Sequence, residues 1–244
     1  MHGGDGYFDE RVAARYDASE ADMFDAVRVG PVVDVLMELA DGRDALEFGI
    51  GTGRIALPLA ERGIRVHGID LSKAMVEELR SKPGGDAIPV TIGDFATTEV
   101  EGTFSLVYLV FNTIMNLTTQ TEQVACFRNA ARHLEPGGRF VIETVVPELR
   151  RLPPGERVRA FEVSETRWGI DEYDVGAQGV VSHHFDLVDG ELRRVSIPFR
   201  YVWPSELDLM AAMARMTLRE RWDDWDRQPF TSESRKHISI WELV

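Results

Sequence analysis

Apolar positions along this chain switch between strand spacing and helix spacing in a regular order. From residue 45 to residue 146, short apolar runs alternate with segments whose apolar residues recur every three or four positions. The expected strands are 45–48, 64–69, 88–92, 104–110 and 139–146, and the expected helices are 54–62, 73–79 and 121–134. Ser72 is a good N-cap for the second of these helices. Alternating strands and helices imply right-handed crossovers and a parallel sheet, so the predicted fold class is α/β and doubly wound.

The first forty residues have helical spacing. An apolar stripe is expected to face the core and comprises Val27, Val32, Val33, Leu36 and Leu39. Pro31 suits the first turn of the second helix, where its missing N–H costs no hydrogen bond. We therefore expect N-terminal helices before the first strand.

The alternation ends near residue 150. Residues 157–168, 180–187 and 192–202 are rich in strand-forming residues, and no helical segment separates them. The Asp189-Gly190 pair predicts a hairpin turn between the last two stretches. A helix over 204–214 and strands over 217–222 and 237–243 follow. The prediction is one domain over residues 1–244: N-terminal helices (1–40), a ligand-binding core (41–148), an antiparallel insertion (150–203) and final elements (204–244).

Composition narrows the possible partners. The chain has 244 residues, 44% hydrophobic and 28% charged, which suits one globular α/β domain. Its formal net charge of -14 would repel a nucleic acid, and its basic residues are dispersed. We therefore expect no nucleic-acid partner.

The single cysteine, Cys126, cannot form an intramolecular disulfide, which favours a reducing compartment. Its place in an expected helix predicts a small core residue rather than a nucleophile. The N-terminus lacks the features of a signal peptide, and no apolar run reaches the roughly 20 residues of a membrane span. The expected location is the cytoplasm.

A glycine-rich segment, residues 47–53 (EFGIGTG), joins the first expected strand to its helix. Glycines permit a tight turn and let a ligand approach the backbone, and the following helix start presents free N–H groups. Such a loop suits either the pyrophosphate of NAD or the methionine part of S-adenosylmethionine. The dinucleotide pattern G-x-G-x-x-G would need glycine at position 54, which is Arg54.

Further polar and aromatic residues follow the next strands in order. Asp70 ends the second strand, where a carboxylate accepts from ribose hydroxyls; its alternative role is to cap the next helix. Asp94 and Phe95 follow the third strand and suit an adenine amino group and ring, or else a turn and core packing. Phe111-Asn112 leaves the fourth strand at the edge where ligands bind, and either residue could instead pack or cap.

This ordered set, together with the turn at 134–138 (LEPGG), resembles the class I S-adenosylmethionine-dependent methyltransferases over residues 40–146. The resemblance implies a Rossmann-like, mostly parallel seven-stranded sheet, S-adenosylmethionine as methyl donor and S-adenosylhomocysteine as product. It implies small-molecule acceptors such as natural products, sugars or other metabolites. An insertion like 150–203 also forms a dimer interface in some members, so a homodimer is one expectation.

The same resemblance implies the cofactor residues. Those expected to line the methionine and ribose parts are Glu47, Gly49, Gly51, Gly53, Asp70 and Leu71. Asp94 and Phe95 are expected at the adenine, and the Phe111 backbone near the methionine amino group. The N-terminal helix resembles a lid, with Tyr7 on the acceptor side; Tyr16 either lies at the cofactor mouth or packs between helices.

The sequence offers acceptor-side candidates without choosing among them. His183, His184 and Asn112 are candidates for catalysis, although adjacent strand residues point to opposite faces, so at most one histidine faces a given pocket. Candidates for acceptor binding are Asn116, Trp168, Arg200, Tyr201 and Trp203. The aromatic members have packing in strands as their alternative role. No metal-ligand spacing is present in the sequence.

The predicted function is therefore methyl transfer to oxygen or nitrogen of a small molecule. Two alternatives stay open: a nicotinamide-dependent oxidoreductase, and a non-catalytic protein that binds S-adenosylmethionine.

Overall fold

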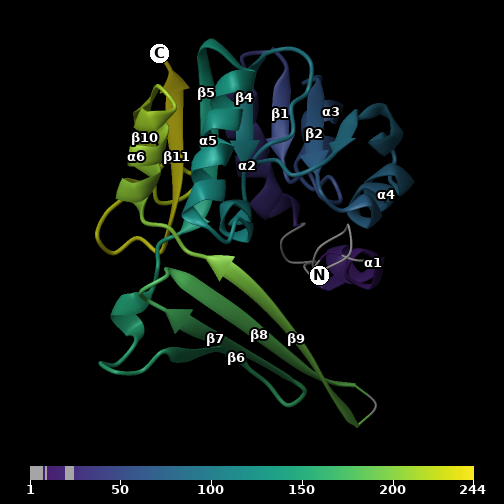
Figure 1. Ribbon diagram of the computed structural model, residues 1–244. Helices are drawn as coiled ribbons and strands as arrows, with labels where there is room; N and C mark the ends of the chain where they lie inside the picture. The colour runs from purple at the N-terminus through teal and green to yellow at the C-terminus, as the bar shows by residue number, and fades with distance from the viewer. Residues whose placement is uncertain (1–7, 9, 20–24, 189) are drawn as a thin grey trace.

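The computed structural model describes residues 8, 10–19, 25–188 and 190–244 (Figure 1). In this part of the chain, one sheet has seven strands in the order β10-β11-β5-β4-β1-β2-β3. Its strands are β1 (Ala45–Phe48), β2 (Val66–Asp70), β3 (Val90–Ile92), β4 (Phe104–Leu109), β5 (Leu134–Val145), β10 (Met216–Trp222) and β11 (Lys236–Leu243). Strands β1 to β5 pair in parallel, whereas β11 is antiparallel to β5 and to β10. The mostly parallel seven-stranded α/β sheet is confirmed.

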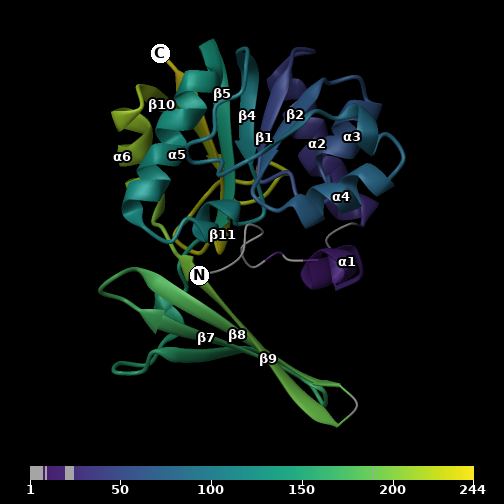
Figure 2. The ribbon, with the colours of Figure 1, turned by 45° about the vertical axis from the view of Figure 1, so that its right-hand side comes forward.

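Helices cover both faces of this sheet (Figure 2). One face packs against α2 (Ala26–Ala40), α3 (Ala56–Glu61) and α4 (Lys73–Ser81), and the other packs against α5 (Gln120–His133) and α6 (Pro204–Met213). Cys126 lies fully buried in α5, as predicted for a small core residue. Within the described residues, no helix has the length and apolar character needed to cross a membrane.

Side-chain caps define where these helices begin. Ser72 accepts from the backbone N–H of Met75 at 3.1 Å, so the predicted cap of α4 is confirmed. The α5 helix begins with a reciprocal capping box, in which Thr119 accepts from the N–H of Glu122 and the Glu122 carboxylate accepts from the N–H of Thr119. Two otherwise unsatisfied donors at the start of α5 are thereby bonded.

The expected start of α2 was wrong. The helix begins at Ala26 behind the N-cap Asp25, so Pro31 lies inside it rather than in its first turn. Pro31 cannot donate to the carbonyl of Val27 one turn earlier. Both residues face solvent, and Val27 is 80% exposed, so water can satisfy that carbonyl. Val27 therefore does not belong to the buried stripe, whereas the other four predicted members do.

Several expected boundaries also change. The helix predicted from residue 54 begins at Ala56, because Gly53 has φ +82° and keeps the chain out of helical geometry. The turn predicted at 134–138 is part of β5, where Leu134 pairs with Phe104 and a register shift follows. The predicted stretch 157–168 is two strands, separated by a turn that Ser164 and Arg167 close with reciprocal hydrogen bonds.

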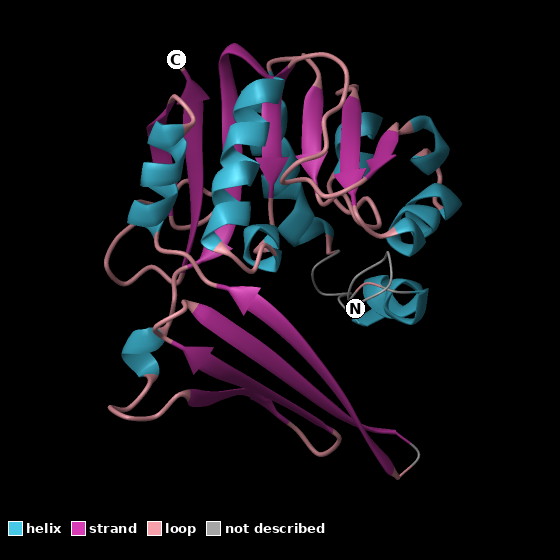
Figure 3. Cartoon of the chain, in the orientation of Figure 1, coloured by secondary structure: helices cyan, strands magenta, loops and turns pink. Residues whose placement is uncertain are grey.

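The insertion folds into its own four-stranded antiparallel sheet. Its strands, in spatial order, are β6 (Val158–Val163), β7 (Arg167–Asp174), β8 (Gly179–Val188) and β9 (Glu191–Arg200). Val188 pairs with Glu191, so the predicted β8–β9 hairpin is confirmed. The sheet lies below the seven-stranded sheet (Figure 3) and meets the 3₁₀ helix η3 (Thr113–Asn116) through β9.

The capping box predicts a measurable stability effect. Thr119→Ala removes the acceptor for the Glu122 N–H and should lower the free energy of unfolding by about 1 kcal/mol. The neighbouring substitution Thr118→Ala, at an exposed position outside the box, should leave it within about 0.5 kcal/mol of wild type. Urea denaturation followed by circular dichroism checks both, and equal effects of the two variants would contradict the assigned cap.

Candidate active site

The carboxyl ends of the parallel strands meet at one edge of the sheet. That edge faces α1 (Glu10–Ser19) and the four-stranded sheet (Figure 1). Open α/β sheets bind their ligands at this edge. The candidate site is therefore the edge formed by the ends of β1, β2 and β4, and it is called the carboxyl-edge site below.

The glycine loop after β1 has a backbone that other residues adopt with strain. Gly49, Gly51 and Gly53 have φ values of +72°, +55° and +82°. A Cβ on Gly49 would meet Cγ2 of Thr113 at 2.7 Å, and one on Gly53 would meet Cδ1 of Leu79 at 2.3 Å. Packing and backbone conformation thus both require glycine at 49 and 53.

Asp70 ties this loop to the end of β2. Its Oδ2 accepts from the N–H of Gly51 at 2.7 Å, and its Oδ1 accepts from the N–H of Ser72 at 2.8 Å. Burial raises the pKa of Asp70, and these backbone hydrogen bonds lower it. A carboxylate has about four acceptor positions, so these backbone hydrogen bonds leave acceptor capacity for a ligand hydroxyl. The geometry combines the capping role with room for the predicted ribose role.

Glu47 lies under the loop in the core. It is 4% exposed, and its Oε2 accepts from the hydroxyl of Tyr108 at 2.8 Å. Burial raises the pKa of Glu47 to about 8, against the lowering effects of the Tyr108 hydrogen bond and of the Arg54 charge. The Glu47 carboxyl therefore supports the loop from below.

Asp94 and Phe95 follow β3 in a tight turn. Asp94 Oδ1 accepts from the N–H of Ala96 at 2.8 Å. The Phe95 ring is buried and stacks on Phe48 at a centroid distance of 5.8 Å. Turn formation and core packing account for these contacts, and the adenine role of Asp94 and Phe95 stays a prediction. Leu71, by contrast, is 49% exposed beside Asp70 and offers apolar surface at the edge.

The chain leaves β4 through two consecutive left-handed residues. Phe111 and Asn112 have φ values of +56° and +63°, conformations that strain residues with side chains. Glu143 on β5 holds both: its Oε2 accepts from the N–H of Phe111 at 3.2 Å and its carbonyl accepts from the N–H of Asn112 at 3.1 Å. Asn112 Oδ1 accepts in turn from the N–H of Val145 at 2.8 Å. The side-chain oxygen of Asn112 is thus bonded to the backbone of β5. This structural role explains the presence of Asn112 without the predicted catalytic role.

Sequence reasoning missed Glu143 and Arg54. Glu143 lies in the predicted strand 139–146, and a carboxylate within a buried strand is itself a signal because it requires a partner. The guanidinium carbon of Arg54 lies 3.3 Å from the centre of the Phe111 ring. Arg54 served in the sequence only to exclude the dinucleotide pattern.

The N-terminal helix α1 is attached directly to the glycine loop. Asp17 Oδ1 accepts from the hydroxyl of Thr52 at 2.7 Å, and the Asp17 carboxylate is ion-paired with Lys82. Lys82 also donates to the carbonyl of Thr52 at 2.8 Å. Tyr16 packs edge-to-face against Phe8 at 6.1 Å, as its helix-packing role predicts. Tyr7 lies outside the described residues.

The two candidate histidines point to opposite faces of β8, as predicted. His183 Nδ1 is 2.8 Å from Ser196 Oγ, and His184 Nε2 is 3.3 Å from Ser182 Oγ. The hydrogen-bond partners described for both rings lie within the four-stranded sheet. The structure does not join either histidine to the glycine loop.

The remaining acceptor-binding candidates differ in whether they are buried within the fold or lie near the carboxyl-edge site. Arg200 is buried and donates to Gln123 on α5 and to Glu206 on α6, so it anchors β9 instead of facing an acceptor. This contradicts its predicted acceptor-binding role, because both of its charge-assisted partners are internal. Tyr201 is buried too, but among the described residues its hydroxyl has no hydrogen-bond partner.

Asn116 ends η3 beside β9 and is half-buried. Trp203 is 38% exposed at the start of α6, and Trp168 is half-buried on β7. Asn116, in the 3₁₀ helix that follows β4, is thus the acceptor-side candidate that the chain places beside the end of that strand.

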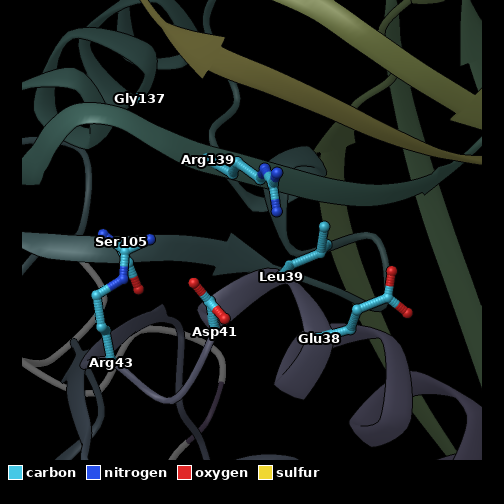
Figure 4. Close-up of a pocket in the computed structure, with 7 residues that line it drawn as sticks. All are labelled: Glu38, Leu39, Asp41, Arg43, Ser105, Gly137 and Arg139. Carbon is cyan, nitrogen blue, oxygen red and sulfur yellow. The ribbon is translucent and has the colours of Figure 1, made fainter.

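A separate hollow of about 320 Å³ lies at the opposite, amino-terminal edge of the sheet (Figure 4). Its lining includes Ser105, whose hydroxyl donates to the carbonyl of Ala40 at 2.9 Å, and Arg43, which is ion-paired with Glu135. These groups are engaged within the chain, so the hollow is not the candidate site. Across the described residues, no group of three or more His, Cys, Asp or Glu side chains could hold a metal ion.

The buried Glu47 predicts a pH-dependent stability. Because the pKa of Glu47 is raised from 4.5 to about 8 in the folded protein, its stabilising effect is present at low pH and is lost as the pH rises toward 8. Glu47→Gln removes this titration. The free energy of unfolding of the variant should therefore increase relative to that of wild type as the pH rises. The gain should be on the order of a few kcal/mol, since a tenfold change in proton affinity corresponds to about 1.36 kcal/mol.

Urea unfolding at about pH 5.5 and about pH 9 measures the difference in free energy of unfolding between wild type and Glu47→Gln. Glu61→Gln, at an exposed position on α3, is the matched control and should follow wild type. Parallel pH dependence of wild type and Glu47→Gln would contradict the assignment.

Comparison with known proteins agrees with this geometry. Residues 45–138 match the family model described as a methyltransferase domain. A cypemycin N-terminal methyltransferase from a Streptomyces species is 28% identical over 205 residues, covering 83% of this chain and 84% of that protein. An amino pentose methyltransferase from Micromonospora echinaspora has a TM-score of 0.71 at 22% identity, covering 94% and 96%, a likeness that shows the fold alone.

The CcbJ methyltransferase from Streptomyces caelestis is similar to this chain in both sequence and structure. Its structure superposes with a TM-score of 0.80 at 36% sequence identity, covering 88% of this chain and 88% of that protein. The similarity extends beyond the glycine-loop region to most of the chain. The chain belongs to the class I S-adenosylmethionine-dependent methyltransferases.

Proposed function

We propose that this protein transfers a methyl group from S-adenosylmethionine to a nitrogen or oxygen of a small natural-product molecule. The carrying observation is Asp70 at the carboxyl-edge site, which joins the glycine loop to the start of α4 and keeps acceptor capacity for a ligand hydroxyl. Relatives named as a cypemycin N-terminal methyltransferase and an amino pentose methyltransferase support a natural-product acceptor.

The residues at this edge fit the cofactor. Gly49 and Gly51 expose backbone that a side chain would otherwise cover, and Asp70 suits a ribose diol. Carboxylates of Asp94 and Glu143 lie around the loop and strand ends and favour a cationic ligand. When bound, S-adenosylmethionine supplies a methyl group already activated by its positive sulfonium.

The chain itself must place the acceptor and exclude water. Asp17 and Thr52 hold α1 against the glycine loop, where the helix shields the edge. On the other side, β9 meets η3 next to the Phe111-Asn112 turn. We assign acceptor contact to Tyr201 and Asn116 there. The proposal assigns no general base, because the hydrogen bonds described for both candidate histidines are internal to their sheet.

The proposal extends to partners and location. A net charge of -14 supports a small acceptor rather than a nucleic acid. The four-stranded sheet exposes apolar side chains, including Val163 at 75% and Leu192 at 62%, which supports pairing of two copies through this sheet. The lone buried thiol of Cys126 supports a cytoplasmic location.

Asp70→Ala tests the proposal. Loss of the hydrogen bonds to the ribose should weaken S-adenosylhomocysteine binding by about 10- to 100-fold, because bonds to a charged acceptor contribute about 1.5–3 kcal/mol. Asp86→Ala, at an exposed carboxylate in the 3₁₀ helix η2 (Gly85–Ala87), is the matched control and should bind as wild type does.

Calorimetry measures both affinities, and thermal melting verifies that each variant is folded. Unchanged affinity in folded Asp70→Ala would overturn the ribose assignment.

A further inference from the structure

We propose that Lys236 is a positioning residue for the cofactor, which acts through Glu143 on the turn that follows β4. The proposal rests on the proposed function and adds a residue to its cofactor site. Lys236 is the first residue of β11 and pairs with Val145 near the end of β5. It therefore stands at the carboxyl edge, where β5 alone separates β11 from β4.

The Glu143 carboxylate needs a positive partner where it lies. Glu143 is 7% exposed within β5, and its Oε2 accepts from the N–H of Phe111 at 3.2 Å. A carboxylate taken out of water is unfavourable unless charged or hydrogen-bonding partners compensate it. Lys236 is such a partner, because its Nζ lies 3.6 Å from Oε1 of Glu143. One carboxylate oxygen thus faces Lys236, and the other holds the turn.

Lys236 is itself held from the opposite side. Its Nζ lies 2.8 Å from Oδ1 of Asp224, in the loop between β10 and β11. The same oxygen accepts from the N–H of Trp225 at 2.7 Å, and Trp225 is buried in the core. Burial lowers the pKa of Lys236, but the Asp224 and Glu143 carboxylates outweigh this effect and raise that pKa. A charged and anchored ammonium therefore faces Glu143.

The turn after β4 depends on such support. Phe111 and Asn112 both have positive φ, a conformation that residues with side chains keep only when their surroundings hold them. The side chain of Lys236 acts on Phe111 through Glu143. Its pairing partner Val145 donates to the side chain of Asn112. Lys236 thus supports both strained residues.

Loss of Lys236 would leave the buried charge of Glu143 without its cation. The turn would then populate conformations in which the Phe111 backbone no longer has its present place, which is expected near the methionine amino group. The affinity for the cofactor falls in proportion to the fraction of molecules that keep the binding-competent conformation. Cofactor affinity therefore reports on the turn.

Two other roles of Lys236 would give different results. If Lys236 acted only through its charge, it would repel the positive sulfonium, and its removal would strengthen the binding of S-adenosylmethionine. If it were merely structural, its removal would lower the free energy of unfolding and leave the affinity of the folded protein unchanged. A positioning residue differs from both, because its removal weakens binding of S-adenosylmethionine and S-adenosylhomocysteine alike.

The test measures both affinities by calorimetry. Lys236→Met should weaken each by about 5- to 20-fold, as expected when about 5–20% of the molecules keep the competent turn. Lys236→Arg, which keeps the positive charge, should bind within about threefold of wild type. Asp224→Asn, at an exposed position, should give a smaller loss of about two- to fivefold. Arg80→Met, at an exposed position on α4, is the matched control and should bind as wild type does.

A double-mutant cycle shows whether Lys236 acts through Glu143. Glu143→Gln keeps an oxygen for the Phe111 N–H and removes the buried charge, so it no longer needs a cation. In that background, Lys236→Met should change the affinity by less than about twofold. Thermal melting verifies that each variant is folded.

Unchanged affinity in folded Lys236→Met, tighter binding of S-adenosylmethionine, or an equal loss with and without Glu143→Gln would overturn the proposal and leave the proposed function intact. If Lys236→Met does not fold, unchanged affinity in Asp224→Asn overturns the proposal in the same way. Failure of wild type to bind either ligand would instead overturn the proposed function.

Discussion

The carboxyl-edge site depends on one interaction, the acceptance of the Gly51 and Ser72 N–H groups by the Asp70 carboxylate. Three glycines with positive φ cannot hold a single loop conformation by themselves, because glycine has more freedom than any other residue. Asp70 supplies the missing constraint by joining the loop after β1 to the start of α4. The loop then carries Thr52, to which α1 is attached through Asp17.

The neighbouring strand end is built on the same principle. Strained backbone at Phe111 and Asn112 persists because Glu143 and Val145 of β5 bond to both residues from the side. Three strand ends are thereby fixed by carboxylates that also make the site acidic. That acidity favours a cationic methyl donor.

Local signals explain what could be predicted from the sequence. The glycine turn after β1, the Ser72 cap and the antiparallel pairing of β8 with β9 each depend on neighbouring residues, and each was confirmed in the fold. The same holds for Asp70, which follows its strand at the expected edge. Its ribose contact stays a prediction.

Long-range contacts explain what could not be predicted. Arg200 resembled a ligand-binding residue until the fold placed its guanidinium against Gln123, 77 positions away in sequence. The Phe95 ring turned inward because Phe48 lies beside it, and the apolar pattern alone did not show that Val27 precedes the buried part of α2. Which partner satisfies a buried charge is decided by tertiary packing, which one sequence does not display.

The central claim concerns the cofactor class, and it is tested most directly by titrating the wild-type protein with S-adenosylhomocysteine and, separately, with NAD. The account predicts binding of S-adenosylhomocysteine in the micromolar range and no measurable binding of NAD. Preference for NAD, or no binding of S-adenosylhomocysteine, would contradict it.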